Sequence, residues 1–512
     1  MLMAKKVSPY DQLHALSKTT ALLTSIESLL EWDQETFMPA DAIQGRALQI
    51  EWLASLVHKN RTSPAFAKRL GRLIDIKTGA IQDASLSPKE MASVREWRRD
   101  YLKAVKLPNA FVKQFAKTTA TSSHAWKSAK RHNDFREFAP HLEKVVSLCR
   151  KKADILGFQE HPYDALLDLY EPDMKTSFLL PLFSKLRLEL TALLKEITAK
   201  PPISQDCLHR HCPKHQQKAF TSLLLKAMGF HDGFSRIDFS AHPFCSRLLP
   251  EDVRMTTKIH PDNPFFSIFA VLHEGGHGLY SLGLPKEAFG SPLSEPLSLG
   301  IDESQSRWWE TLIGQSRPFW EYFFPLLQRE FPSQFEEVTL DDLYRAINHV
   351  TPSLIRIEAD EVTYNLHIIV RFELEKALIE GSVKVREIPD LWNAKIRECL
   401  GVSPRFDGEG CLQDIHWSLG LFGYFPTYAL GNLYAAQFFN TFEKQFADWN
   451  RRVAGGDLAF VREWLRENIH QYGRQFSSTE LCQKATGQPL SPDHFMRYLR
   501  HKYGSLYCIQ LS

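Results

Sequence analysis

Apolar residues recur at helical spacing along most of the chain. The clearest stretches are residues 13–30, 180–198, 217–228, 341–381 and 430–450. Apolar positions three or four residues apart form one face of a helix, whereas a half-buried strand alternates at every second position. Such alternation is rare and short in this chain. The pattern therefore predicts an all-α protein, mainly helical with few short strands.

The chain shows no internal repeat, no low-complexity tract and no long polar linker. Three stretches have the composition of loops: residues 200–215, 284–296 and 401–410. We expect a single domain over residues 1–512, with a possible N-terminal helical lobe at about 1–200 and a catalytic part at about 201–512. A substrate groove between two such lobes is the expected arrangement.

Charge and cysteine content narrow the function classes. Lys and Arg number 62 against 60 Asp and Glu, which gives a formal net charge of +2 and argues against a nucleic-acid partner. Eight cysteines spread over 512 residues are too sparse for a disulfide scaffold. The apolar run 265–272 is far shorter than a membrane span, and residues 1–10 lack the apolar core of a signal peptide. We expect a cytoplasmic protein without a membrane partner.

The strongest chemical signal is an H-E-x-x-H motif at His273, Glu274 and His277. Asn263 followed by Pro264 is typical of a helix start, and an apolar run leads from there into the motif. One helical turn separates the two histidines, so both imidazoles can reach one metal ion. Glu274 is rotated by about 100° from His273, where a carboxylate can take a proton from a water without binding the metal. The motif predicts a catalytic metal site.

Two glycines interrupt the helix inside this motif. Gly275 and Gly276 each cost about 1 kcal/mol relative to alanine in a helix. This cost predicts a close approach by another backbone or by substrate.

A catalytic zinc site also needs a third protein ligand. Glu303 is our candidate, because the loop 284–296 is long enough to turn the chain back and lay a second helix beside the first. Asp302 and Glu287 are competing carboxylates that the sequence alone does not exclude.

At this point the chain resembles a known family, the carboxypeptidase Taq type of metallocarboxypeptidases, also called thermostable carboxypeptidases. The resemblance covers nearly the whole chain and depends on six ordered signatures rather than on one. These signatures are His242-Pro243-Phe244, Asp252 to Thr256, His273 to His277, Asp302-Glu303-Ser304-Gln305, Ile355 to Asp360, and Gly410 to Trp417.

The resemblance implies a helical H-E-x-x-H peptidase fold with two lobes around a deep groove. It implies a metallocarboxypeptidase that removes single C-terminal residues from peptides with broad specificity, with one divalent metal per chain. We expect zinc, with cobalt or manganese as acceptable alternatives. The metal ligands would be His273, His277 and Glu303, with Glu274 as general base. The resemblance also implies a homodimer.

Further site residues are implied by the same resemblance. Tyr424 and His416 would stabilise the reacting carbonyl oxygen, and Arg356, His242 and Tyr428 would bind substrate. Arginine suits the terminal carboxylate because guanidinium binds carboxylate through two parallel hydrogen bonds. Aromatic residues are also typical of a buried core, and an arginine can simply pair with a carboxylate one turn away, here Asp360.

One departure from the family is visible, and two other functions remain open. The family usually has histidine where this chain has Asp302, beside the candidate ligand Glu303. The alternative enzyme is a metal-dependent oligopeptidase or dipeptidyl carboxypeptidase, which shares the metal chemistry and differs at the end of the groove. A scaffold with an inert metal site is the non-enzymatic alternative, but it would have no need of Glu274.

Overall fold

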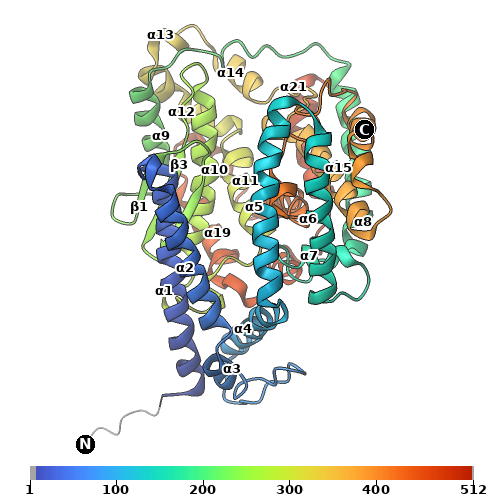
Figure 1. The fold of residues 1–512 in the computed structure, drawn as a ribbon. Coiled ribbons are helices and arrows are strands. Elements are labelled where there is room, and N and C mark those ends of the chain that lie inside the picture. The colour runs from blue at the N-terminus through green and yellow to red at the C-terminus, as the bar shows by residue number, and fades with distance from the viewer. Residues whose placement is uncertain (1–6, 510–512) are drawn as a thin grey trace, which may run out of the picture.

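The computed structural model describes residues 7–509 and is mainly helical, which confirms the prediction from apolar spacing (Figure 1). The N-terminal half contains α1 (Pro9–Thr36), α2 (Ile43–Arg61), α3 (Pro64–Leu70), α4 (Pro88–Lys106), α5 (Asn109–His132), α6 (Phe135–Leu156), α7 (Pro162–Leu167), α8 (Thr176–Thr198) and α9 (Lys214–Met228). The remaining helices are α10 (Pro264–Gly283), α11 (Leu299–Arg307), α12 (Arg317–Glu330), α13 (Pro332–Phe335), α14 (Leu340–Ile347), α15 (Glu361–Glu380), α16 (Ile388–Leu400), α17 (Pro426–Gln445), α18 (Trp449–Ala454), α19 (Ala459–Asn468), α20 (Ser478–Thr486) and α21 (Asp493–Tyr507).

The described residues form one small sheet. Its strands are β1 (Ser235–Phe239), β2 (Cys245–Leu249) and β3 (Asp252–Thr257), in the order β1-β3-β2. β1 pairs with β3 in parallel, and β2 pairs with β3 in the antiparallel sense. β2 is therefore an edge strand.

The prediction of helix across residues 341–381 is wrong in the middle. Residues 348–360 separate α14 from α15 and contain only a short 3-10 turn. Pro352 lies in this segment and has no backbone N–H to give to a helix. Asp360 ends the break, because its carboxylate accepts hydrogen bonds from the backbone N–H groups at the start of α15, including Val362 at 2.9 Å.

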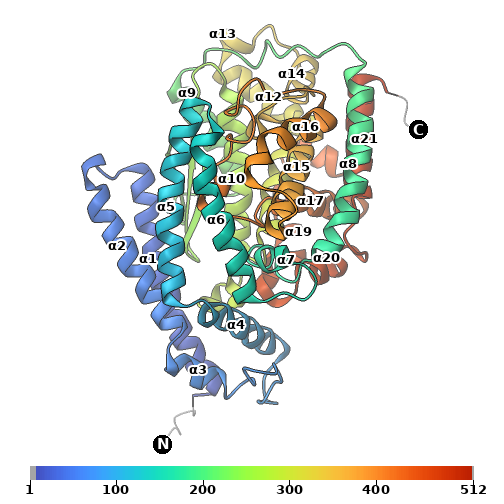
Figure 2. The ribbon, with the colours of Figure 1, turned by 45° about the vertical axis from the view of Figure 1, so that its right-hand side comes forward.

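Buried apolar side chains form two clusters among the described residues. The main cluster extends from Trp126 to Tyr507 and contains side chains from both sides of residue 200. The smaller cluster joins α1, α3 and α4 around Leu13, Leu70 and Trp97. Figure 2 shows α1 and α2 side by side along one side of the larger body. The division into two lobes near residue 200 stays a prediction.

Glycines let the three central helices α10, α11 and α17 approach closely. A Cβ atom at Gly276 of α10 would lie 2.4 Å from the carbonyl oxygen of Gln305 on α11. A Cβ atom at Gly431 of α17 would lie 2.5 Å from Cγ of Glu303. The predicted close approach by another backbone is confirmed at Gly276, whereas Gly275 faces the side chain of Met228.

The length and apolar character of the helices bear on the membrane prediction. Among residues 7–509, every helix falls short of the length and apolar character that crossing a bilayer demands. The signal-peptide prediction falls partly on residues 1–6, which lie outside the described residues.

Candidate metal centre

Helix α10 begins where the sequence predicts and carries the H-E-x-x-H motif in its middle. Asn263 is its N-cap, and the side chain accepts a hydrogen bond from the backbone N–H of Phe266 at 3.3 Å. Pro264 occupies the first turn, where a missing N–H costs nothing. The motif helix therefore forms for the local reasons that the sequence provides.

Two imidazoles and one carboxylate converge beside this helix. Nε2 of His273 and Nε2 of His277 each lie 3.7 Å from Oε2 of Glu303. Their candidate ligand atoms all lie within 4.8 Å of one another. Tetrahedral ligands that are each about 2.1 Å from a zinc ion lie about 3.4 Å apart, so these side chains fit a zinc-sized ion with little movement.

The structure distinguishes the three carboxylates that the sequence left as candidates for the third metal ligand. Glu303 faces both imidazoles, whereas Asp302 contacts the other side of one of them. Glu287 is exposed in the short 3-10 turn after α10 and contacts neither histidine.

Each histidine also donates a hydrogen bond from Nδ1 to a carboxylate. His273 Nδ1 lies 2.7 Å from Glu310, and His277 Nδ1 lies 2.8 Å from Asp302. Such bonds fix the tautomer that leaves Nε2 unprotonated and turned toward a metal. Sequence reasoning missed Glu310, which lies in the π-helical turn that follows α11.

The charges of the centre depend on one another. Burial alone would raise the pKa of Glu310, but Arg307 and His273 lower it to about 2. Burial alone would lower the pKa of His277, but Asp302 and the neighbouring carboxylates raise it. Burial raises the pKa of Glu274, against the opposing effect of both histidines. The centre is thus an anionic cluster that favours a cation.

Arg356 is buried, and its carboxylate partner is not Asp360, the partner that the sequence offered as an alternative. Its Nε and Nη2 lie 3.1 and 2.8 Å from Oδ1 of Asp414, and its Nη1 lies 3.0 Å from the Tyr364 hydroxyl. Arg371 pairs with the second oxygen of Asp414 at 2.6 Å. The alternative pair with Asp360 does not form, because that carboxylate caps α15.

The predicted aromatic residues gather around Arg356. Its guanidinium lies 5.0 Å from the ring centroid of Tyr428, and the Tyr428 hydroxyl lies 3.3 Å from Nε2 of His416. The Tyr424 ring is 5.3 Å from the Tyr428 ring. Burial raises the pKa of Tyr424, and the carboxylate of Glu303 raises it further.

Glu375 accepts hydrogen bonds from residues beside this aromatic group, and sequence reasoning also missed it. It accepts hydrogen bonds from the Tyr163 hydroxyl at 2.6 Å, from Trp417 Nε1 at 2.9 Å and from the backbone N–H of Gly423 at 3.0 Å. The last two donors flank the turn that presents His416 and Tyr424. No local pattern predicts a partner so far along the chain.

His242 is not brought into this group. It lies on the loop between β1 and β2 and is exposed. Its side chain makes no hydrogen bond within residues 7–509.

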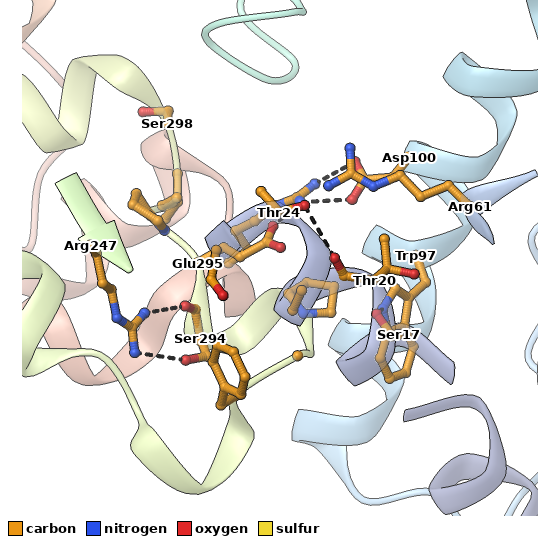
Figure 3. Close-up of a pocket in the computed structure, with 18 of the residues that line it drawn as sticks. Ser17, Thr20, Thr24, Arg61, Trp97, Asp100, Arg247, Ser294, Glu295 and Ser298 are labelled. Carbon is orange, nitrogen blue, oxygen red and sulfur yellow. Dashed lines mark hydrogen bonds and ion pairs between the residues drawn. The ribbon is translucent and has the colours of Figure 1, made fainter. Parts of the chain in front are cut away.

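A cavity of about 640 Å³ lies between the N-terminal helices and the body, and Asp302 contributes to its wall. Figure 3 shows Thr20 and Thr24 of α1 between Trp97 on one side and Glu295 and Arg247 on the other. Arg247 donates hydrogen bonds to the carbonyl and hydroxyl oxygens of Ser294 at 2.5 and 3.1 Å. Asp302, which contacts His277, lines this cavity, whereas the three converging side chains do not.

A buried carboxylate behind α11 gives a testable pH dependence of stability. Glu171 is fully buried, and one of its oxygens accepts a hydrogen bond from the backbone N–H of Gly300 at 3.0 Å. Burial raises the pKa of Glu171 to about 7. The bound proton stabilises the folded chain fully below about pH 4.3, the pKa of this carboxyl in the unfolded chain. This stabilisation is lost as the pH rises through about 7, its pKa in the folded chain.

We therefore expect Glu171→Gln to become more stable than the unaltered protein as pH rises from 5 to 8. The gain is up to about 3 kcal/mol, and the glutamine oxygen can still accept the bond from Gly300. Urea unfolding at several pH values measures the difference. Parallel stability curves for the two proteins would contradict the assignment.

Comparisons with known proteins agree over almost the whole chain. Residues 12–503 match the family described as carboxypeptidase Taq (M32) metallopeptidase. Thermostable carboxypeptidase 1 of Thermus thermophilus is 42% identical, over 97% of this chain and 99% of that protein. Carboxypeptidase 1 of Bacillus subtilis is 36% identical, over 94% and 95%. The crystal structure of the M32 carboxypeptidase from Deinococcus radiodurans R1 superposes with a TM-score of 0.94 at 36% identity, covering 98% of this chain and 99% of that one.

Proposed function

The chain belongs to the carboxypeptidase Taq (M32) metallopeptidase family and is a metal-dependent carboxypeptidase that releases C-terminal amino acids, and from this premise we propose which of its residues perform the reaction. His273, His277 and Glu303 hold the metal. The observation that carries this assignment is the 3.7 Å spacing of both imidazole Nε2 atoms from one Glu303 oxygen.

Zinc is the metal we propose, with cobalt and manganese as alternatives. Two imidazoles and one carboxylate are the donor set of many catalytic zinc sites, and neither alternative metal is excluded by these ligands. When bound, the metal supplies Lewis acidity, which lowers the pKa of a water molecule toward about 7 and polarises the scissile carbonyl.

Glu274 acts as the general base. It lies on the same helical turn as His273 but does not take part in the triad of converging ligand atoms. Its carboxylate accepts a proton from the attacking water and donates it to the leaving amine. Burial of Glu274 supports this role, because a carboxylate poorly solvated by water is a stronger base.

Tyr424 and His416 stabilise the negative charge on the carbonyl oxygen. The raised pKa of Tyr424 keeps its hydroxyl protonated, so the hydroxyl can donate a hydrogen bond at neutral pH. Burial lowers the pKa of His416 to about 4, so its ring is neutral, and Nδ1 has no partner among the described residues.

Arg356 receives the terminal carboxylate, with Tyr428 beside it. Three of its N–H groups are used by Asp414 and Tyr364, which leaves two of the five for substrate. His242 joins the substrate-binding residues by the family resemblance. Its loop leads directly into β2, and Cys245 and Arg247 of that strand line the cavity.

Replacing Arg356 with lysine is expected to lower kcat/KM by about 10²-fold or more, mainly through a higher KM. Lysine keeps the charge near Asp414 but cannot bind a carboxylate through two parallel hydrogen bonds. Steady-state kinetics on a short peptide measure the change. Metal content is the control and should be unchanged, and kinetics equal to those of the unaltered enzyme would exclude Arg356 from substrate binding.

The cell compartment, assembly and domain organisation complete the proposal. We propose a cytoplasmic protein, because all eight cysteines are unpaired.

We propose a homodimer on the family resemblance, supported by exposed apolar side chains on the α1–α2 pair: Leu22, Ile26, Leu29, Leu48 and Trp52. The main buried cluster, which crosses residue 200, supports a single domain over 1–512. A monomer in sedimentation equilibrium would contradict the dimer.

The function is tested with metal-stripped enzyme and one peptide in two forms. We expect the peptide with a free C-terminus to lose single residues only after zinc, cobalt or manganese is added back. The same peptide as its C-terminal amide should be resistant. Mass spectrometry distinguishes the products, and release of dipeptides or cleavage of the amide would instead support the oligopeptidase alternative.

A further inference from the structure

Asp302 contacts His277, a proposed metal ligand, from the side of the ring that faces away from Glu303. Its Oδ1 accepts a hydrogen bond from Nδ1 of His277 at 2.8 Å. The next residue, Glu303, is itself a proposed ligand, so one helical turn of α11 supplies both a ligand and the support of a second ligand. We propose that Asp302 is a positioning residue that tightens metal binding through His277, an inference that depends on the proposed function.

The two imidazoles have unequal carboxylate partners. Glu310, the partner of His273, also pairs with Nη1 of Arg307 at 2.8 Å, so its negative charge is shared with a cation. Asp302 has no such cation: among the described residues, His277 is the only side chain with which its carboxylate pairs. The full charge of Asp302 therefore acts on His277.

This charge changes the balance of the whole centre. Glu274, Asp302, Glu303 and Glu310 carry four negative charges when ionised, and Arg307 carries one positive charge. A bound dication leaves one negative charge in excess, whereas a neutral histidine at position 302 would leave none. Because Asp302 and His277 are only partly exposed, with 24% and 21% of their side-chain surfaces accessible, solvent screens this difference less than it would on an open surface.

The carboxylate also fixes the direction of the ring. An acceptor on Nδ1 holds the proton there and leaves the Nε2 lone pair for the metal. A carboxylate makes this bond stronger than a neutral acceptor does and increases the basicity of Nε2. Charge and orientation therefore favour the same outcome, which is slower loss of the metal.

The test compares Asp302→Asn and Asp302→His with the matched control Glu287→Gln. Asparagine can still accept the bond from His277 but has no charge, and histidine replaces the carboxylate with a neutral ring. Glu287→Gln removes one negative charge from an exposed position that contacts neither histidine. Zinc affinity is measured by competition with a chromophoric chelator, and zinc release is followed after an excess of chelator is added.

We expect both Asp302 variants to bind zinc 10- to 100-fold more weakly and to release it faster. The control should stay within about twofold of the unaltered protein, and thermal unfolding of the metal-free chains shows whether each variant folds. Zinc binding by Asp302→Asn within about twofold of the unaltered protein would overturn this inference alone. Failure of the unaltered protein to bind zinc, cobalt or manganese would overturn the proposed function as well.

Discussion

Glu274→Gln is expected to lower kcat/KM by on the order of 10²–10⁴-fold while the protein keeps its metal. Glutamine has nearly the same shape as glutamate but cannot accept a proton from water. Glu274 is buried on α10 and is not one of the three side chains whose ligand atoms converge, so the metal site should survive the change. Peptide hydrolysis and elemental analysis of the same preparation measure both quantities.

The control for this experiment is Glu303→Gln. This change removes the carboxylate that faces both imidazoles, so we expect loss of metal together with loss of activity. Two chemically identical substitutions should therefore give opposite metal contents. Activity of Glu274→Gln within about tenfold of the unaltered enzyme would exclude the general-base role, and loss of its metal would mean that Glu274 is a ligand.

The sequence predicts the metal helix well because its determinants are local. Asn263 and Pro264 have their predicted roles at the start of α10, and His273 and His277 lie one turn apart on that helix. The choice among Glu303, Asp302 and Glu287 is different. It depends on how α11 packs against α10, which no local pattern contains.

Sequence reasoning missed the ion-pair and hydrogen-bond partners of the site residues that come from outside the local helical pattern. Asp414 is the partner of Arg356, and it replaces the local candidate Asp360 because capping of α15 uses the Asp360 carboxylate. Glu310 was missed because it lies in a π-helical turn, Trp308–Ile313, that directly follows α11. The wider turn changes which residues share a face, so ordinary helical spacing does not describe the positions after it.

The approach of α10 to α11 should also be measurable. We expect Gly276→Ala to weaken metal binding at least tenfold and to lower the free energy of unfolding by about 2 kcal/mol. The added Cβ would lie 2.4 Å from the Gln305 carbonyl oxygen and 2.6 Å from Cα of Ser306, and both atoms belong to backbone. The two helices must therefore move apart, which carries Glu303 away from the imidazoles.

Gly275→Ala is the matched control, because the same atom is added one position earlier. There the Cβ would lie 2.6 Å from Cε of Met228, the far end of a flexible side chain that can change its rotamer. Alanine also favours a helix over glycine by about 1 kcal/mol. We therefore expect Gly275→Ala to keep its metal affinity and to gain up to about 1 kcal/mol of stability. Chelator competition and urea unfolding measure both variants, and equal behaviour of the two would mean that contact between the α10 and α11 backbones does not set the position of Glu303.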